Sequence, residues 1–168
     1  MNRKTAVFGA VFALAVIFTT ASAKAATDDD KKFLAMAAQS DQNEIAMSQL
    51  AQQKATNPAV KAFADKMVAE HTKMSASMKP FADDWGLTPP SGPDSDHLSE
   101  INKLQGLSGN DFDKEYISDM VSDHAKALSA FTTEAKDTKD AKFRTAVLKG
   151  KTMVAAHKNM AYDLKKKL

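Results

Sequence analysis

Cysteine is absent from this 168-residue chain, and tryptophan occurs once. Without cysteine the chain can form no disulfide, and it cannot carry the lipidated cysteine of a bacterial lipoprotein. Proline and glycine are also scarce, and three of the five prolines and four of the six glycines lie within residues 85–109. The fold must therefore be stabilised by packing alone, with its main interruption in that one segment.

The chain also lacks an excess of charge of one sign. Its 23 basic and 21 acidic side chains become 21 of each if a cleaved leader removes Arg3 and Lys4. A nucleic-acid-binding protein normally needs a basic face, so we expect no nucleic-acid partner. The basic run Lys165–Lys167 fits the negative end of a final helix.

Only one long uncharged run is present, from Thr5 to Ala23, and it follows a basic start and ends in Ala21-Ser22-Ala23. This pattern predicts a signal peptide over residues 1–23, cleaved after Ala23 or Ala25, and export to the periplasm or beyond. An uncleaved anchor is the alternative. We expect no membrane-spanning segment after cleavage, and the remaining residues 24–168 have the length of one domain.

Four segments have the three-to-four-residue apolar spacing of amphipathic helices. The first should begin after Thr27 or Asp28 and end before Asn57-Pro58, where the second begins with an N-cap and a proline. Pro80 should kink or terminate the second helix. The last two are expected from about Asn110 to Lys136 and from about Lys139 onward.

The segment between the second and third of these helices is rich in helix breakers, although residues 96–104 could form a short helix. Two hairpins joined by one long connection predict an all-α, ferritin-like four-helix bundle with a crossover between its second and third helices.

The sequence Met-Val-x-x-His occurs three times, ending at His71, His124 and His157. Residues i and i+4 share one face of a helix, so each histidine should lie beside a methionine on a buried stripe. If the crossover runs back along the bundle, these histidines and Glu44 fall within roughly 10 Å along its axis.

This predicted cluster is a candidate site for a single transition-metal ion, zinc, iron or copper, because imidazole and carboxylate are suitable ligands for all three. Its core members are Glu44, His71, His124 and His157. The additional candidates are Asp119, Asp123 and Tyr116. The alternative is a cluster of core side chains that only hydrogen-bond to one another. His97, in the breaker-rich segment, is expected to be exposed and not a ligand.

Several stretches together resemble a bacterial family of secreted ferritin-like domains of unknown function, whose members are often named outer-membrane or exported proteins. They are Phe33-Leu34 with Glu44, residues 57–64 leading to His71, residues 107–113 with Tyr116, Met120 and His124, and finally His157. The resemblance covers nearly the whole chain after the leader and implies an exported ferritin-like bundle without an established activity.

Di-iron chemistry is not expected, because Val68, Val121 and Val154 stand where Glu-x-x-His motifs would place glutamate. A mononuclear site is the simpler hypothesis, in a metal-binding or stress-protective protein. The second hypothesis is a non-enzymatic envelope-stress or interaction module with an envelope protein as partner. A metal-dependent oxidoreductase or hydrolase is the third, but no nucleophile motif or nucleotide loop supports an enzyme.

Overall fold

The computed structural model describes residues 26–168, and the predicted signal peptide and both predicted cleavage positions lie outside them. Within these residues the chain forms helices and no strands. The helices are α1 (Asp28–Lys54), α2 (Pro58–Trp85), α3 (Ser95–Gln105), α4 (Gly109–Asp137) and α5 (Ala141–Lys165). The prediction of an all-helical bundle is confirmed.

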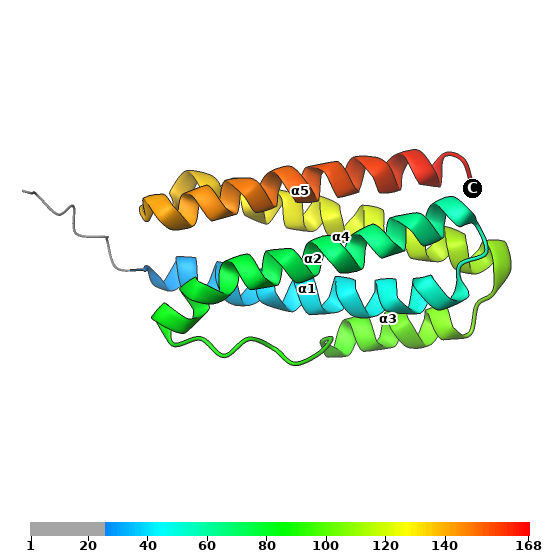
Figure 1. Ribbon diagram of the computed structural model, residues 1–168, viewed down its shortest axis with the longest axis horizontal. Coiled ribbons are helices and arrows are strands. Elements are labelled where there is room, and N and C mark those ends of the chain that lie inside the picture. Colours follow the sequence, from blue (N-terminus) through cyan, green and yellow to red (C-terminus); the bar gives the residue numbers. More distant parts are fainter. Residues whose placement is uncertain (1–25) are drawn as a thin grey trace, which may run out of the picture.

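The four long helices form two hairpins that pack against each other (Figure 1). The pairs α1–α2 and α4–α5 make the most extensive contacts, and α1 also packs on α4 and α2 on α5. The linker and α3 return along the outside of the bundle, so that α2 and α4 run in the same direction (Figure 1). α3 packs mainly on α1 and α4.

Local sequence signals explain where the helices begin and end. Thr27 caps α1 in a capping box with Asp30, and Asn57 caps α2 ahead of Pro58. Of the two effects predicted for Pro80, a kink or a stop, the stop is wrong, because α2 continues to Trp85 and ends at Gly86 in the left-handed conformation. A proline this close to the end removes one backbone hydrogen bond from a helix that is otherwise well packed.

The core consists of two apolar clusters, one toward each end of the bundle. One contains Met47, Met67 and Tyr116, and the other contains Phe33 and Phe131. Between these clusters along the helices lies a layer of buried polar side chains, namely Asp41, Glu44, His71, His124 and His157. Burying so many polar groups is costly unless they are paired, so this layer needs a specific explanation.

We expect Gly150→Ala to destabilise the protein by about 1–3 kcal/mol, the usual cost of overpacking. A Cβ atom at position 150 would lie 2.4 Å from Cε1 of Phe131 and 3.1 Å from the sulfur of Met74. Urea unfolding measures the loss. Gly92→Ala is the control, because a Cβ at position 92 meets no atom within 4 Å; equal losses for the two variants would contradict the packing argument.

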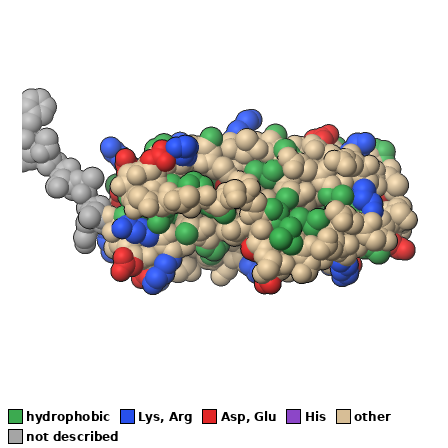
Figure 2. Space-filling model, turned by 90° about the horizontal axis from the view of Figure 1, so that it is seen from below, with side chains coloured by type: hydrophobic (Ala, Val, Ile, Leu, Met, Phe, Trp, Pro, Cys, Tyr) green, Lys and Arg blue, Asp and Glu red, His purple; other side chains and the backbone are tan. Residues whose placement is uncertain are grey.

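Charged side chains are spread around the molecule without forming one large patch of a single sign on the face seen in Figure 2, which carries α3. Among the helices of residues 26–168, none is both long and apolar enough to cross a membrane.

Candidate metal centre

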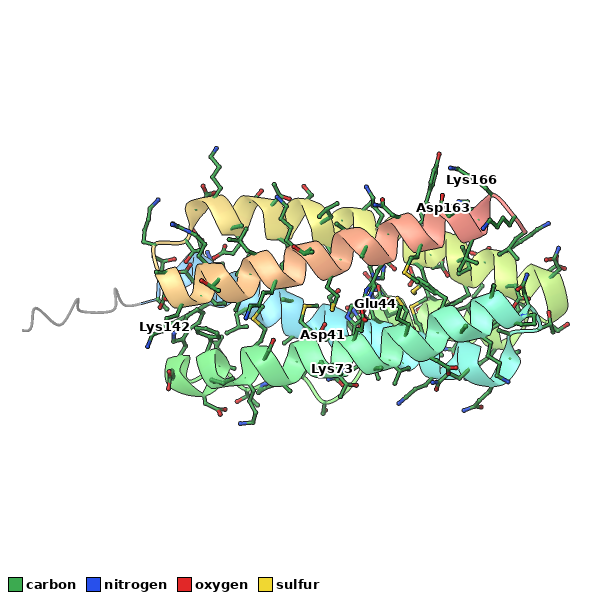
Figure 3. The ribbon with its side chains drawn as sticks, turned by 45° about the horizontal axis from the view of Figure 1, so that its top comes forward. Asp41, Glu44, Lys73, Lys142, Asp163 and Lys166 are labelled. Atoms are coloured by element: carbon green, nitrogen blue, oxygen red, sulfur yellow. The ribbon has the colours of Figure 1, made fainter. Side chains whose placement is uncertain are left out.

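Three histidines from three helices meet in the middle of the bundle. His71 of α2, His124 of α4 and His157 of α5 are each at most 2% exposed. Their ring centroids form a nearly equilateral triangle with sides of 5.6, 5.3 and 5.4 Å. The two acidic residues of α1 that belong to the same layer, Asp41 and Glu44, lie near the middle of the long axis (Figure 3).

The orientation of His71 is set by a buried carboxylate. Nδ1 of His71 lies 2.8 Å from Oδ1 of Asp41, whose other oxygen accepts a hydrogen bond from the Ser75 hydroxyl at 2.8 Å. Because an ionised carboxylate only accepts, Nδ1 carries the proton. Nε2 of His71 is buried and has no hydrogen-bond partner among the described residues.

His124 is oriented by the backbone of its own helix. Its Nδ1 lies 2.8 Å from the carbonyl oxygen of Met120, one turn earlier. A carbonyl cannot donate, so Nδ1 is again the protonated nitrogen. Nε2 of His124 is likewise buried without a partner among residues 26–168.

His157 uses the opposite nitrogen. Its Nε2 donates to Oε2 of Glu70 at 2.6 Å, and Glu70 is held in turn by Lys66. Nδ1 of His157 is therefore the nitrogen with a free lone pair in the neutral ring, and it too is buried and has no partner within the described chain.

Each imidazole is thus hydrogen-bonded through one nitrogen and leaves a lone pair on the other. Ligand nitrogens of the three rings lie within 4.8 Å of one another. Hydrogen bonds of this kind fix the tautomer and direction of metal-binding histidines in proteins. Lone pairs gathered without a donor repel one another, so the arrangement favours a positively charged or electron-accepting guest.

Glu44 adds a carboxylate to the same layer. Its Oε1 lies 3.5 Å from Nδ1 of His124, and its Oε2 is buried without a hydrogen-bond partner among the described residues. Burial raises the pKa of Glu44 to about 8, although the nearby His71 opposes this rise. In the metal-free protein the carboxyl group is therefore mostly protonated at neutral pH.

Two histidines of the centre, His124 and His157, have lowered pKa values and so favour the neutral ring, which is the metal-binding form. Burial lowers the pKa of His124, although its hydrogen bond to the Met120 carbonyl acts in the opposite direction. Burial also lowers the pKa of His157 to about 4, although its hydrogen bond with Glu70 acts in the opposite direction. At neutral pH both rings are available as ligands without losing a proton.

The donor set fits a transition-metal ion. Three imidazole nitrogens suit zinc, copper, iron and nickel, and a carboxylate can complete a four-coordinate shell. Bonds of 2.0–2.1 Å require nitrogens about 3.5 Å apart. One ring nitrogen from each of the three histidines already lies within 4.8 Å of the other two. The three unpartnered ring nitrogens thus have one common explanation. Glu44 lies in the same layer but is not among the side chains whose ligand atoms lie within 4.8 Å of one another.

The additional predicted candidates lie elsewhere. The Tyr116 hydroxyl is 2.8 Å from Ser48 Oγ, and Asp119 is half-buried beside acidic side chains, with burial and then Glu115 raising its pKa to about 7. Asp123 faces His97.

Sequence reasoning missed Asp41 and Glu70, which hold two of the three histidines. The sequence does hold a signal for Asp41, because it lies on one face of α1 in a series of residues three or four apart. All members of this series are buried: Leu34, Ala37, Asp41, Glu44, Ser48 and Ala51. The expectation that His97 is exposed is also wrong: it lies in the first turn of α3, and its side chain is only 20% exposed.

Comparisons with known proteins agree with a helical bundle. The model of a family described as "Domain of unknown function (DUF4142)" matches residues 17–164. No curated protein matches the chain.

Solved structures share the fold at low sequence identity. A DUF305 fragment from Deinococcus radiodurans has a TM-score of 0.75 and 12% identity, over 85% of this chain and 99% of that one. A DUF305 protein from Streptomyces coelicolor, described as secreted, has a TM-score of 0.69 and 16% identity, over 81% and 91%. CopM in its Cu(I)-bound form has a TM-score of 0.70 and 20% identity, over 82% and 96%, and is also known in silver- and Cu(II)-bound forms.

Proposed function

The chain belongs to the DUF4142 family of domains of unknown function, and we propose that it is an exported protein that binds one transition-metal ion between His71, His124 and His157, with Glu44 as a fourth ligand. The observation that carries the proposal is the set of buried, unpartnered atoms at the centre: one nitrogen from each ring and Oε2 of Glu44. Export through residues 1–23, with cleavage after Ala23 or Ala25, is part of the proposal.

Copper is the ion to test first. Three nitrogen donors suit Cu(I) or Cu(II), and thioethers are ligands that Cu(I) accepts. Met67 and Met120, each one turn before a histidine of the centre, are fully buried in the adjoining cluster. CopM, which has been solved with copper and silver, shares the fold. Zinc and iron are the other candidates, for which three nitrogens and one oxygen are an ordinary ligand set.

A ferritin-like assignment of the bundle is part of this proposal. Two hairpins joined by a long crossover, with α2 and α4 running in the same direction, support it (Figure 1). The three valines that stand three residues before the histidines argue against a di-iron site within that fold.

We expect protein purified from the periplasm, without affinity metals, to carry or take up close to one equivalent of copper. Elemental analysis and an anaerobic Cu(I) titration against a competing chelator measure this. The variant His71→Gln/His124→Gln should lose uptake by at least tenfold, because it removes two ligands while retaining polar side chains of similar size.

His97→Gln is the matched control, since it removes a histidine outside the centre and should keep the copper. Folded protein that takes up no copper, zinc or iron, or a double variant that binds copper as tightly as the wild type, would overturn the proposal. Either result favours a structural polar core in an interaction module.

A further inference from the structure

A second group of ligand-type side chains lies at the surface, where α3 packs against α4. It consists of His97 and Glu100 of α3 and Asp123 of α4, whose ligand atoms all lie within 4.8 Å of one another. These side chains are between 12% and 37% exposed, in contrast to the fully buried centre.

His97 is held in one orientation by the cap of α3. Oδ1 of Asp94, the N-cap residue, accepts from Nδ1 of His97 at 2.8 Å and from its backbone N–H at 2.9 Å. Asp94 is itself fixed by Asn43 of α1, which donates to its other carboxylate oxygen at 2.8 Å and accepts from its backbone N–H at 3.0 Å. A carboxylate that accepts from one nitrogen of a histidine is the usual support of a metal-binding imidazole.

The other nitrogen of His97 faces two carboxylates. Asp123, and then Asp94, raise the pKa of His97 to about 9, so a metal ion bound between these groups would replace the proton on Nε2. Nε2 lies 3.7 Å from Oδ2 of Asp123 and 3.8 Å from Oε2 of Glu100. Both distances exceed a normal hydrogen bond, and both oxygens are buried without a hydrogen-bond partner among the described residues. A metal ion about 2.1 Å from each atom would need only a slight closing of the group.

The surroundings are accessible and on balance negative. A groove of about 430 Å³ reaches the group, lined by His97 and Asp123 together with Asp94. Asp119 is a further half-buried carboxylate nearby, and its negative neighbours include Glu100 and Asp123. Lys126, which pairs with Asp123 Oδ1 at 2.9 Å, also lines this groove.

We propose that His97, Glu100 and Asp123 form a second site, which takes a divalent cation such as Zn²⁺ and fastens α3 to α4. One imidazole and two carboxylates are borderline-to-hard ligands, which select zinc, manganese or iron(II) rather than Cu(I). The two sites therefore differ in their donor atoms. The core site is rich in nitrogen and enclosed, whereas the surface site is rich in oxygen and open to solvent. The second site is independent of the first.

The test is a Zn²⁺ titration by calorimetry, made on the full mature chain, its His71→Gln/His124→Gln variant and its Glu100→Gln/Asp123→Asn variant. The core variant should retain one equivalent of zinc. The surface variant should lose that equivalent, or bind it at least tenfold more weakly, while keeping Cu(I) in the core. Asp96→Asn is the control for Glu100→Gln, because it removes an exposed negative charge from the same helix and should leave zinc binding unchanged.

Hydrogen exchange supplies a second readout, since zinc should slow the exchange of amides in residues 95–105 of the core variant. The proposal is overturned if the folded core variant binds no zinc, if Asp96→Asn weakens binding as much as the surface substitutions, or if zinc leaves exchange in α3 unchanged. Failure of the core proposal gives a different pattern: no copper in the wild type, with zinc binding still dependent on Glu100 and Asp123.

Discussion

Asp41→Ala is expected to lower the free energy of unfolding of the metal-free protein by about 2–4 kcal/mol and its copper affinity by about 10–100-fold. The Asp41 side chain is 1% exposed and accepts hydrogen bonds from both His71 and Ser75. Alanine leaves the buried N–H of His71 and the half-buried hydroxyl of Ser75 without this acceptor, which accounts for the loss of stability. It also frees the His71 ring to rotate, which accounts for the loss of affinity.

Urea unfolding of the metal-free protein and a chelator-competition titration with Cu(I) measure the two effects separately. Asp41→Asn is the matched control, because its amide oxygen can still accept from Nδ1 of His71, and we expect it to retain most of the affinity. Ser75→Ala removes only the outer hydrogen bond and should cost about 1 kcal/mol. An Asp41→Ala protein that binds copper like the wild type would contradict the positioning role of Asp41.

Glu44→Gln is expected to stabilise the metal-free protein by about 2–4 kcal/mol at pH 8.5 and to change it little at pH 5. The pKa of Glu44 is raised in the folded protein to about 8, from an ordinary value of 4.5, first because the group is buried. The folded state therefore keeps a proton that the unfolded state releases over this range. Stability due to this group is fully present below pH 4.5 and is lost as the pH rises toward 8.

Glutamine cannot ionise, so the variant should lack this alkaline decline. Unfolding curves of both metal-free proteins at intervals between pH 5 and 8.5 test the sign directly. Other groups with raised pKa values, among them Glu134 at about 7, contribute equally to both curves. The difference between the curves therefore isolates Glu44, and a difference that does not grow with pH would contradict its burial as a neutral acid.

The same measurements should also show a loss of stability at acid pH, which comes from a lowered pKa and not from a raised one. The pKa of His157 falls from 6.5 to about 4 in the folded protein, mainly through burial, so its contribution to stability is present above pH 6.5 and is lost as the pH falls toward 4. The Glu44→Gln variant should keep this loss of stability at acid pH. Copper bound at the centre should reduce the alkaline decline of the wild type, because the ion stabilises the ionised carboxylate.

Much of the fold could be predicted because its signals are local. Thr27, Asn57 and Pro58 mark helix ends through their own backbone preferences. Apart from the end of α2, the predicted helix ends agree with the observed ones within two residues. Periodicity placed His71, His124 and His157 on buried faces, where the structure has them. Pro80 does not terminate α2, which was one of its two expected effects, since packing of the following turn outweighs one lost hydrogen bond.

The sequence by itself determined that the chain is helical, that residues 24–168 carry equal numbers of acidic and basic side chains, and that three histidines and Glu44 lie inward at similar heights. These properties follow from composition and from a 3.6-residue period, which act along one helix at a time. The tertiary structure alone decided which nitrogen of each ring is hydrogen-bonded and that Asp41 and Glu70 hold two of the rings. It also brought His97 of α3 to Asp123 of α4. Such pairings depend on the rotation and packing of separate helices against one another, and no spacing within a single helix encodes them.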